Sequence, residues 1–438
     1  MINRPPSKTE LLPVALLIAI VWVCFAPGFM SYDSVAQFQS ALEQAYTDNH
    51  PAVMSYVWHL GMKLIPGPVS LLVLHLALLA AGLVAWQANL ERRALRILLP
   101  IVFLLPWTIN FAGVLWKDVG MAFSLLFATA LIFNRARNRK WAVLALPFLF
   151  YATAVRHNAL PAVVPILFFG LWYHFRDWKI WKVAALALLG SGALFATSLL
   201  VSYGFLHAEK RHYETLILGD DLAKISAETH QNLLPWVKPE DLQTCTQGKI
   251  AYERALCFVS KGYDPSGSLV TSMPVDSVYA LWKKTVLSYP SLYLRNRIEA
   301  FAYFLRSPSL EPVYAWQPGI MANAFGIQIQ NPAMARAMEH YVAFALNTVL
   351  REFFKPYLWL LLAVVMTALG ARLAPSVFRT QIIALNTSAL GCFASLMLAV
   401  PAADFRYIYW SVIATTLSVV LYIAARRPSA PPPQSQPI

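Results

Sequence analysis

The sequence predicts an all-α polytopic integral membrane protein, with about ten transmembrane helices, amphipathic helices at the outer surface and one large outer loop. Of the 438 residues, 58% are hydrophobic and only 13% are charged, and the mean hydropathy is +0.52. Soluble domains are less apolar, and several apolar runs approach the roughly 20 residues that cross a bilayer as a helix. The composition therefore excludes a soluble globular domain.

The apolar runs define ten candidate spans. The first run has no small-residue cleavage site before Pro27, so we interpret it as a retained span and not as a removable signal. The Pro-rich end, residues 426–438, is expected to be a disordered cytoplasmic tail. The candidate spans cover residues 11–30, 69–90, 97–115, 119–134, 141–155, 159–175, 183–203, 357–371, 381–400 and 408–425.

Residues 51–65 form an ambiguous apolar run, which either crosses the membrane or lies at its surface. If it lies at the surface, the Lys and Arg clusters of the later turns, 14 residues in total, fall on the side of the N-terminus. The positive-inside rule then makes that side cytoplasmic. We therefore expect an N-terminal catalytic module at 1–203 with its first outer loop at 31–68, a periplasmic subdomain at 204–356, and C-terminal transmembrane helices at 357–425.

The net charge of +13 does not indicate nucleic-acid binding. In a membrane protein, excess Lys and Arg usually sit in cytoplasmic loops or beside lipid phosphates, and no basic tract with a nucleic-acid-binding pattern is present. Membrane lipids are the expected contacts of these charges.

Only two of the four cysteines can bridge. Cys24 and Cys392 lie inside expected spans, whereas Cys245 and Cys257 lie twelve residues apart in the large outer segment. In an oxidising compartment we expect these two to form a disulfide worth about 3 kcal/mol by loop entropy. Two buried free thiols are the alternative.

Asp33 follows the first span, at the boundary between membrane and water. The residues after it predict a helix along the membrane surface, and Ser34 with Gln37 forms a capping pattern that would leave the Asp33 carboxylate free. A cap made by Asp33 itself is the alternative. The face of this helix is marked by Val35, Phe38, Leu42 and Tyr46.

Four further places carry candidate functional groups. Asp48 and His50 could supply a metal site or orient a sugar, although Pro51 could equally begin a helix after a structural turn. Lys117 and Asp118 lie where two spans meet, as an ion pair or as a helix-end anchor. Arg156 interrupts an apolar stretch, and Arg406 lies with Asp404 between the last two spans. Ionisable groups at such places are costly, and Arg presents a fork that suits phosphate.

These residues resemble the pattern of a known family. Tyr32-Asp33-Ser34 after a first span, a surface helix, His50-Pro51, a second acidic residue at Asp118 and the pair Arg406-Tyr407 are similar to the GT-C superfamily of polyprenyl-phosphate-dependent glycosyltransferases. Within it, the protein-mannosyltransferase and aminoarabinose-transferase branch is the most similar. The resemblance covers residues 11–203 best and 357–425 loosely.

The resemblance implies a GT-C-like fold and roles for single residues. Asp33 would be the base or the carboxylate that orients the acceptor, with Asp118 as the second acidic residue. His50 would lie near the sugar, and Arg156 and Arg406 would hold the lipid phosphate, beside Lys117 and Tyr407 as further substrate-binding residues.

The reaction implied is inverting transfer of a sugar from a polyprenyl phosphate, expected to be undecaprenyl phosphate in a bacterial inner membrane. The acceptor would be a hydroxyl of an envelope glycan, lipid or protein on the periplasmic face. A divalent metal stays an open alternative, because the sequence has one Pro after His50 where relatives carry two, and no Asp-x-Asp pair. A multi-pass transporter or lipid flippase is the rival function, although seven spans followed by three show poor repeat symmetry. An envelope scaffold is a third.

Overall fold

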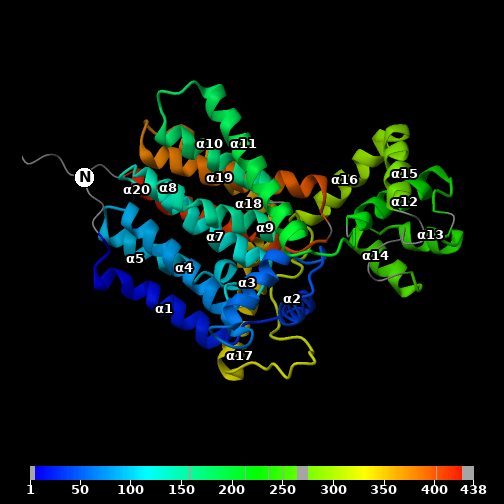
Figure 1. The fold of residues 1–438 in the computed structure, drawn as a ribbon, viewed down its shortest axis with the longest axis horizontal. Helices are drawn as coiled ribbons and strands as arrows, with labels where there is room; N and C mark the ends of the chain where they lie inside the picture. The colour runs from blue at the N-terminus through cyan, green and yellow to red at the C-terminus, as the bar shows by residue number, and fades with distance from the viewer. Residues whose placement is uncertain are drawn as a thin grey trace, which may run out of the picture.

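A computed structural model describes residues 5–426, apart from 157–158, 213, 235, 250, 264–274 and 401. Within these residues the structure is helical, and β-structure is limited to isolated bridges. The helices form a bundle with a smaller helical part beside it (Figure 1). Apart from Arg426, the tail expected to be disordered lies outside the described residues.

Each of the ten expected spans contains at least one helical segment of the bundle, and the chain is an all-α polytopic membrane protein. Five helices of the described part are long and apolar enough to cross a membrane, namely Lys8–Phe25, Val69–Asn89, Ile180–Phe205, Val377–Leu398 and Phe405–Arg426. The bundle helices are α1 (Lys8–Phe25), α4 (Val69–Asn89), α5 (Arg93–Val102), α6 (Pro106–Ile109), α7 (Lys117–Ile132), α8 (Arg139–Leu144), α9 (Leu146–Val155), α10 (Leu160–His174), α11 (Ile180–Leu199), the π-helical turn η2 (Leu200–Phe205), α18 (Pro356–Ala371), α19 (Val377–Leu398) and α20 (Tyr409–Arg426).

Two of the expected spans are interrupted helices. Residues 97–115 form α5, α6 and an extended stretch, with Pro106 starting α6, and residues 141–155 divide into α8 and α9 ahead of Pro147. Proline ends a helix because it lacks an N–H group and its ring clashes with the preceding turn. The first of these segments still traverses the bundle, since Arg96 pairs with Glu10 near the start of α1 and Val114 bridges to Phe29 beyond its end.

Helix α7 lies at the centre of the bundle. Fourteen of its residues are buried, with only Lys117 and Phe127 partly exposed, and it packs against α4, α9 and α20. Outer helices instead turn leucines to the surface, including Leu12 and Leu16 of α1 and Leu188 of α11. A buried central helix and an apolar outer surface fit a bundle surrounded by lipid.

The basic clusters gather at one end of the bundle, which we name the basic end. There Arg93 donates to Thr9, Arg135 pairs with Glu91 at 2.6 Å, and Arg139 donates to the carbonyl of His174. Asp33 and Arg406 lie at the opposite end, which we name the site end. The Lys and Arg clusters thus lie on one side of the bundle, as expected if residues 51–65 lie at the membrane surface.

The first outer loop forms two short helices at the site end, α2 (Tyr32–Glu43) and α3 (Ala52–Met62). Ala52, at the start of α3, shares a hydrophobic cluster with Ala154 at the end of α9. Gly61, near its end, lies against Ser70 at the start of α4. Both ends of α3 therefore lie at the site end, so residues 51–65 run along it and do not cross the bundle.

A smaller helical part stands beside the bundle in Figure 1 and has a hydrophobic core of its own. A disulfide between Cys245 and Cys257, with a Cα–Cα distance of 5.4 Å, links two of its helices. Its helices are α12 (Thr215–Thr229), α13 (Pro239–Thr246), α14 (Ala251–Ser260), α15 (Val275–Ser288) and the first part of α16 (Pro290–Phe304).

The remainder of the large outer segment belongs to the bundle. Ala300 and Phe304 at the end of α16 enter the bundle core, as do residues of α17 (Pro332–Leu346) and of the 3₁₀ helix η3 (Val349–Phe354). The expected single subdomain at 204–356 is thus divided by its packing. Only residues up to the middle of α16 form a separate unit.

Candidate active site

An extended stretch between α1 and α2 sets the position of Asp33. Phe29 donates its N–H to Gly113 at 3.0 Å and accepts from Leu115 at 2.9 Å, so Phe29 pairs with the chain that leads into α7. Gly28 has φ +116, and a Cβ there would lie 2.6 Å from the Leu115 side chain. This close approach in the left-handed region requires glycine. The pairing brings the start of α2 beside the start of α7.

The first turn of α2 differs from the capping pattern expected from the sequence. Its N-cap residue is Ser31, and Ser34 donates its hydroxyl to the carbonyl of Leu115 at 3.0 Å. The Gln37 side chain is buried, so the predicted cap by Ser34 and Gln37 is wrong. The reason is tertiary, because packing on the 113–115 stretch turns Ser34 and Gln37 inward. Asp33 does not cap the helix either, because its carboxylate pairs with Arg406.

The partner of Asp33 is Arg406, in the short 3₁₀ helix η4 (Phe405–Ile408) before α20. Arg406 Nη2 lies 3.0 Å from Oδ2 of Asp33, and its Nε lies 2.7 Å from Oδ2 of Asp404. The guanidinium also stacks over the ring of Trp116, 4.6 Å from the centroid, as cation–π contacts do. One cation is therefore shared by two carboxylates and an aromatic ring.

A second ion pair lies beside the first. Arg156, at the end of α9, pairs through Nη1 with Oδ1 of Asp118, and the Asp118 side chain is fully buried. The Tyr407 ring lies between the two cations, with its centroid 4.6 Å from Cζ of Arg156 and 5.5 Å from Cζ of Arg406. Residues 157–158, which follow Arg156, lie outside the described residues. Asp118 is thus enclosed, whereas the Asp33 side chain keeps 40% of its surface exposed.

Lys117 and His50 complete the cluster. Both act electrostatically on Asp33, and within the described residues Lys117 has no carboxylate within ion-pair distance. His50 lies in the loop after α2, and its buried Nδ1 makes no hydrogen bond within the described part of the chain. Burial, with the charge of Lys117 beside it, lowers the pKa of His50 to about 4. The imidazole is therefore neutral near pH 7.

The charges around Asp33 decide its ionisation. Burial acts to raise the pKa of this carboxyl group, but the positive charges of Arg406 and Lys117 outweigh it and hold the pKa below the ordinary value. Asp404 shows the opposite balance, since burial raises its pKa to about 6 despite the pairing with Arg406. Near pH 7 the site thus holds an ionised, partly exposed carboxylate beside cations.

Asp48 does not join this cluster, contrary to its candidacy with His50 for a metal. Its Oδ1 accepts from the backbone N–H of Arg211 at 2.7 Å, and its Oδ2 accepts from the Tyr203 hydroxyl at 3.4 Å. The two oxygens thereby tie the first outer loop to η2 and to the chain that follows it. Across the described residues, no group of three or more His, Cys, Asp and Glu side chains could hold a metal ion.

The structure therefore brings seven residues singled out in the sequence to one place, and it adds two more. The seven are Asp33, His50, Lys117, Asp118, Arg156, Arg406 and Tyr407. Trp116 was missed, although it directly precedes Lys117, because a tryptophan at a helix end usually indicates a membrane interface. Asp404 was seen only as a neighbour of Arg406, because sequence distance says nothing about its burial.

Comparison with known proteins adds one structural likeness. No protein-family model matches the chain, and no curated protein matches it. The chain resembles the crystal structure of ArnT from Cupriavidus metallidurans bound to undecaprenyl phosphate, with 11% identity over 95% of this chain and 78% of that chain. The TM-score of this match is 0.34.

Proposed function

We propose that this chain is a membrane glycosyltransferase that moves a sugar from a polyprenyl-phosphate donor to a hydroxyl group of an acceptor. One observation carries the proposal: Asp33, ionised and partly exposed, lies among the cations Arg406, Lys117 and Arg156 at one end of a membrane bundle. A carboxylate there can take a proton, and the cations can hold a lipid phosphate.

The reaction is a single displacement. The acceptor hydroxyl gives its proton to the Asp33 carboxylate while its oxygen bonds to the anomeric carbon of the sugar. The bond from that carbon to the phosphate oxygen breaks, and its electron pair leaves with the polyprenyl phosphate. Attack opposite the leaving group inverts the anomeric carbon, and fixed cations stabilise the charge that develops on the phosphate.

The two ion pairs have different parts in this scheme. Asp118 is fully buried and paired with Arg156, so it cannot reach an acceptor and instead holds Arg156 in place. Arg406 is shared between Asp33 and Asp404, and a phosphate that binds it competes with Asp33. Donor binding therefore releases the Asp33 carboxylate for the acceptor proton.

Neutral His50 suits a hydrogen bond to the sugar, because its unpartnered Nδ1 can donate or accept depending on the tautomer. The carboxylates do not fit a divalent ion. Asp33 and Asp118 each face an arginine, and both oxygens of Asp48 are engaged by backbone and tyrosine. These three carboxylates are therefore not available as ligands of a divalent ion.

The proposed setting is a bacterial inner membrane, with undecaprenyl phosphate as the lipid carrier and an envelope glycan, lipid or protein as acceptor. The basic end would face the cytoplasm by the positive-inside rule, which puts the site end on the periplasmic face. This orientation places the donor phosphate at the outer headgroup level, where Asp33 and Arg406 lie at the bundle end.

The test uses the purified full chain in lipid nanodiscs with a polyprenyl-phosphate-linked sugar. A glycosyltransferase releases polyprenyl phosphate in step with acceptor addition and forms a product with inverted anomeric configuration. A flippase would leave the donor intact and only change the leaflet in which it is found, as measured in sealed vesicles. An intact donor with every acceptor class offered would contradict the proposal.

A further inference from the structure

The smaller helical part holds a pocket that the transfer scheme does not use. It has a volume of about 500 Å³ and lies between α12 and α13, away from Asp33. This volume is within the roughly 300–1,000 Å³ typical of small-molecule sites. Its polar lining includes Lys224, Glu228, Gln231, Asn232, Gln243 and Gln247.

The polar lining is rich in carboxamides and also includes His230. Its one lysine, Lys224, is paired with its one carboxylate, Glu228, at 3.0 Å, so neither of these charges is left over for a charged ligand. Gln231, Gln243 and Gln247 are exposed, and their side chains make no hydrogen bond within the described part of the chain. Each carboxamide can donate and accept at once, which matches neighbouring hydroxyl groups of a sugar.

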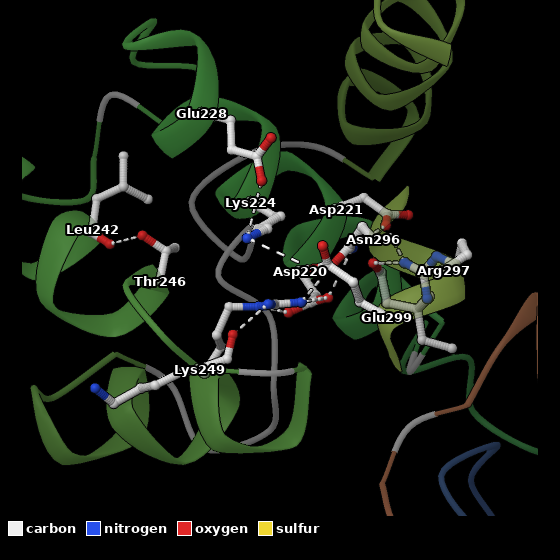
Figure 2. Close-up of polar contacts among 12 residues, drawn as sticks. Asp220, Asp221, Lys224, Glu228, Leu242, Thr246, Lys249, Asn296, Arg297 and Glu299 are labelled. Carbon is white, nitrogen blue, oxygen red and sulfur yellow. Dashed lines mark hydrogen bonds and ion pairs between the residues drawn. The ribbon is translucent and has the colours of Figure 1, made fainter. Parts of the chain in front are cut away.

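Ion pairs and a disulfide support the walls of the pocket. On the α12 side, Glu228 pairs with Lys224 (Figure 2) and with Arg295 at 3.0 Å, and Asp220 of the same helix is held by Arg254 at 2.6 Å. On the α13 side, Leu242 and Thr246 flank the disulfide of Cys245. A site that is rigid in advance loses little entropy on binding.

Helix α16 joins this pocket to the active site. Arg295, near its start, pairs with the pocket residue Glu228, and Phe304, at its end, stacks on Tyr407 with ring centroids 6.4 Å apart. Nine residues of helix separate the two contacts, a rise of about 14 Å. An extended oligosaccharide can cover such a distance.

We propose that this pocket binds a neutral saccharide, the non-reacting part of a glycan acceptor. Apolar lining from Leu242, Ala227 and Pro239 offers contact for the C–H faces of a sugar ring, while the amides take its hydroxyls. The inference that the pocket binds a saccharide depends only on the pocket. The inference that this saccharide is part of the acceptor rests on the proposed function. Binding energy gained far from the reacting centre positions the acceptor hydroxyl.

The experiment is saturation-transfer NMR on the full chain in nanodiscs. The probes are neutral trisaccharides of glucose, mannose and N-acetylglucosamine, each beside a sulfated counterpart. The variants are Gln243→Ala with Gln247→Ala, and Gln243→Trp to fill the pocket; both positions are exposed, so the fold is not at risk. Gln328→Ala, an exposed amide outside the pocket, is the matched control.

At least one neutral trisaccharide is expected to show saturation transfer from the protein, which reports binding. Its affinity should fall about tenfold in the Gln243→Ala, Gln247→Ala double variant and stay unchanged in the Gln328→Ala control. Saturation transfer to none of the neutral probes would overturn the proposal. Binding of a neutral probe by Gln243→Trp that equals binding by the wild type would also overturn it. Asp33→Asn separates the two claims, since it should leave saccharide binding intact. If that variant transfers sugar at the normal rate, the reaction scheme fails while the pocket is judged by its binding alone.

Discussion

Arg406 Nη2 lies 3.0 Å from Asp33 Oδ2, which joins the first outer loop to the start of the last membrane helix. The same guanidinium holds Asp404 and lies over Trp116. A phosphate that enters the site meets a cation that is already partly neutralised. In the proposed reaction, competition for Arg406 would couple donor binding to release of Asp33.

Replacing Arg406 by Ala should weaken use of the lipid donor by about 2–5 kcal/mol, because its buried carboxylate partner is left unpaired. Arg406→Lys keeps the charge without the fork and should retain part of the activity. Steady-state rates against donor concentration measure this. Arg351→Ala, which removes an exposed pair with Glu311, is the control and should change little. If Arg406→Ala used the donor normally, the phosphate-binding role would have to belong to other cations.

The pair of Arg156 and Asp118 should behave as a buried ion pair. Arg156→Ala leaves the fully buried Asp118 charge without this partner and should lower the free energy of unfolding by about 3–5 kcal/mol. The double variant Arg156→Met with Asp118→Leu should regain most of the stability but no transfer activity. Denaturant unfolding in detergent gives the comparison. A double variant as unstable as Arg156→Ala would show that the pair acts in some other way.

Asp404 gives a prediction on pH. Burial raises its pKa from 3.8 to about 6, so the folded state binds this proton more tightly than the unfolded chain. Its contribution to stability therefore falls as the pH rises from about 4 to about 6. Asp404→Asn stays neutral, so the melting temperature of the variant minus that of the wild type should increase over this range. A difference that is constant with pH would contradict the raised pKa.

The two ends of the bundle predict a membrane orientation. A reporter fused after Lys140, at the basic end, should behave as cytoplasmic, and one fused near Lys249, in the smaller helical part, as periplasmic. Alkaline phosphatase and green fluorescent protein fusions read the two sides oppositely. Reversal of either result would remove the periplasmic assignment of Asp33 and Arg406.

The sequence could predict which residues meet at the site because the spans alternate in direction. Asp33, Lys117, Arg156 and Arg406 each follow or precede a span at the same end, so counting spans places them together without any contact being known. Charged residues next to apolar runs stand out in such a chain. The helices could be predicted for the same reason, since apolar length is visible in sequence.

Roles within the site could not be predicted, because they depend on burial. Asp33 and Asp118 are both acidic residues beside a span, yet one is partly exposed and the other fully enclosed. The pairing of Phe29 with residues 113–115 decides this, and it joins segments about 85 residues apart. The same packing reversed the expected helix cap at Ser34. Local sequence patterns do not predict such long-range contacts.

The central claim is that Asp33 accepts the proton of the acceptor hydroxyl, and Asp33→Asn tests it most directly. Asn keeps the shape but cannot take a proton, so the variant should fold, bind the lipid donor and transfer sugar about 10²- to 10⁴-fold more slowly. The measurement is the rate of sugar transfer from purified donor by wild type and Asp33→Asn at equal protein level in nanodiscs. Nearly equal rates would contradict the claim, because a carboxylate that only supports the fold is replaced by Asn with little loss.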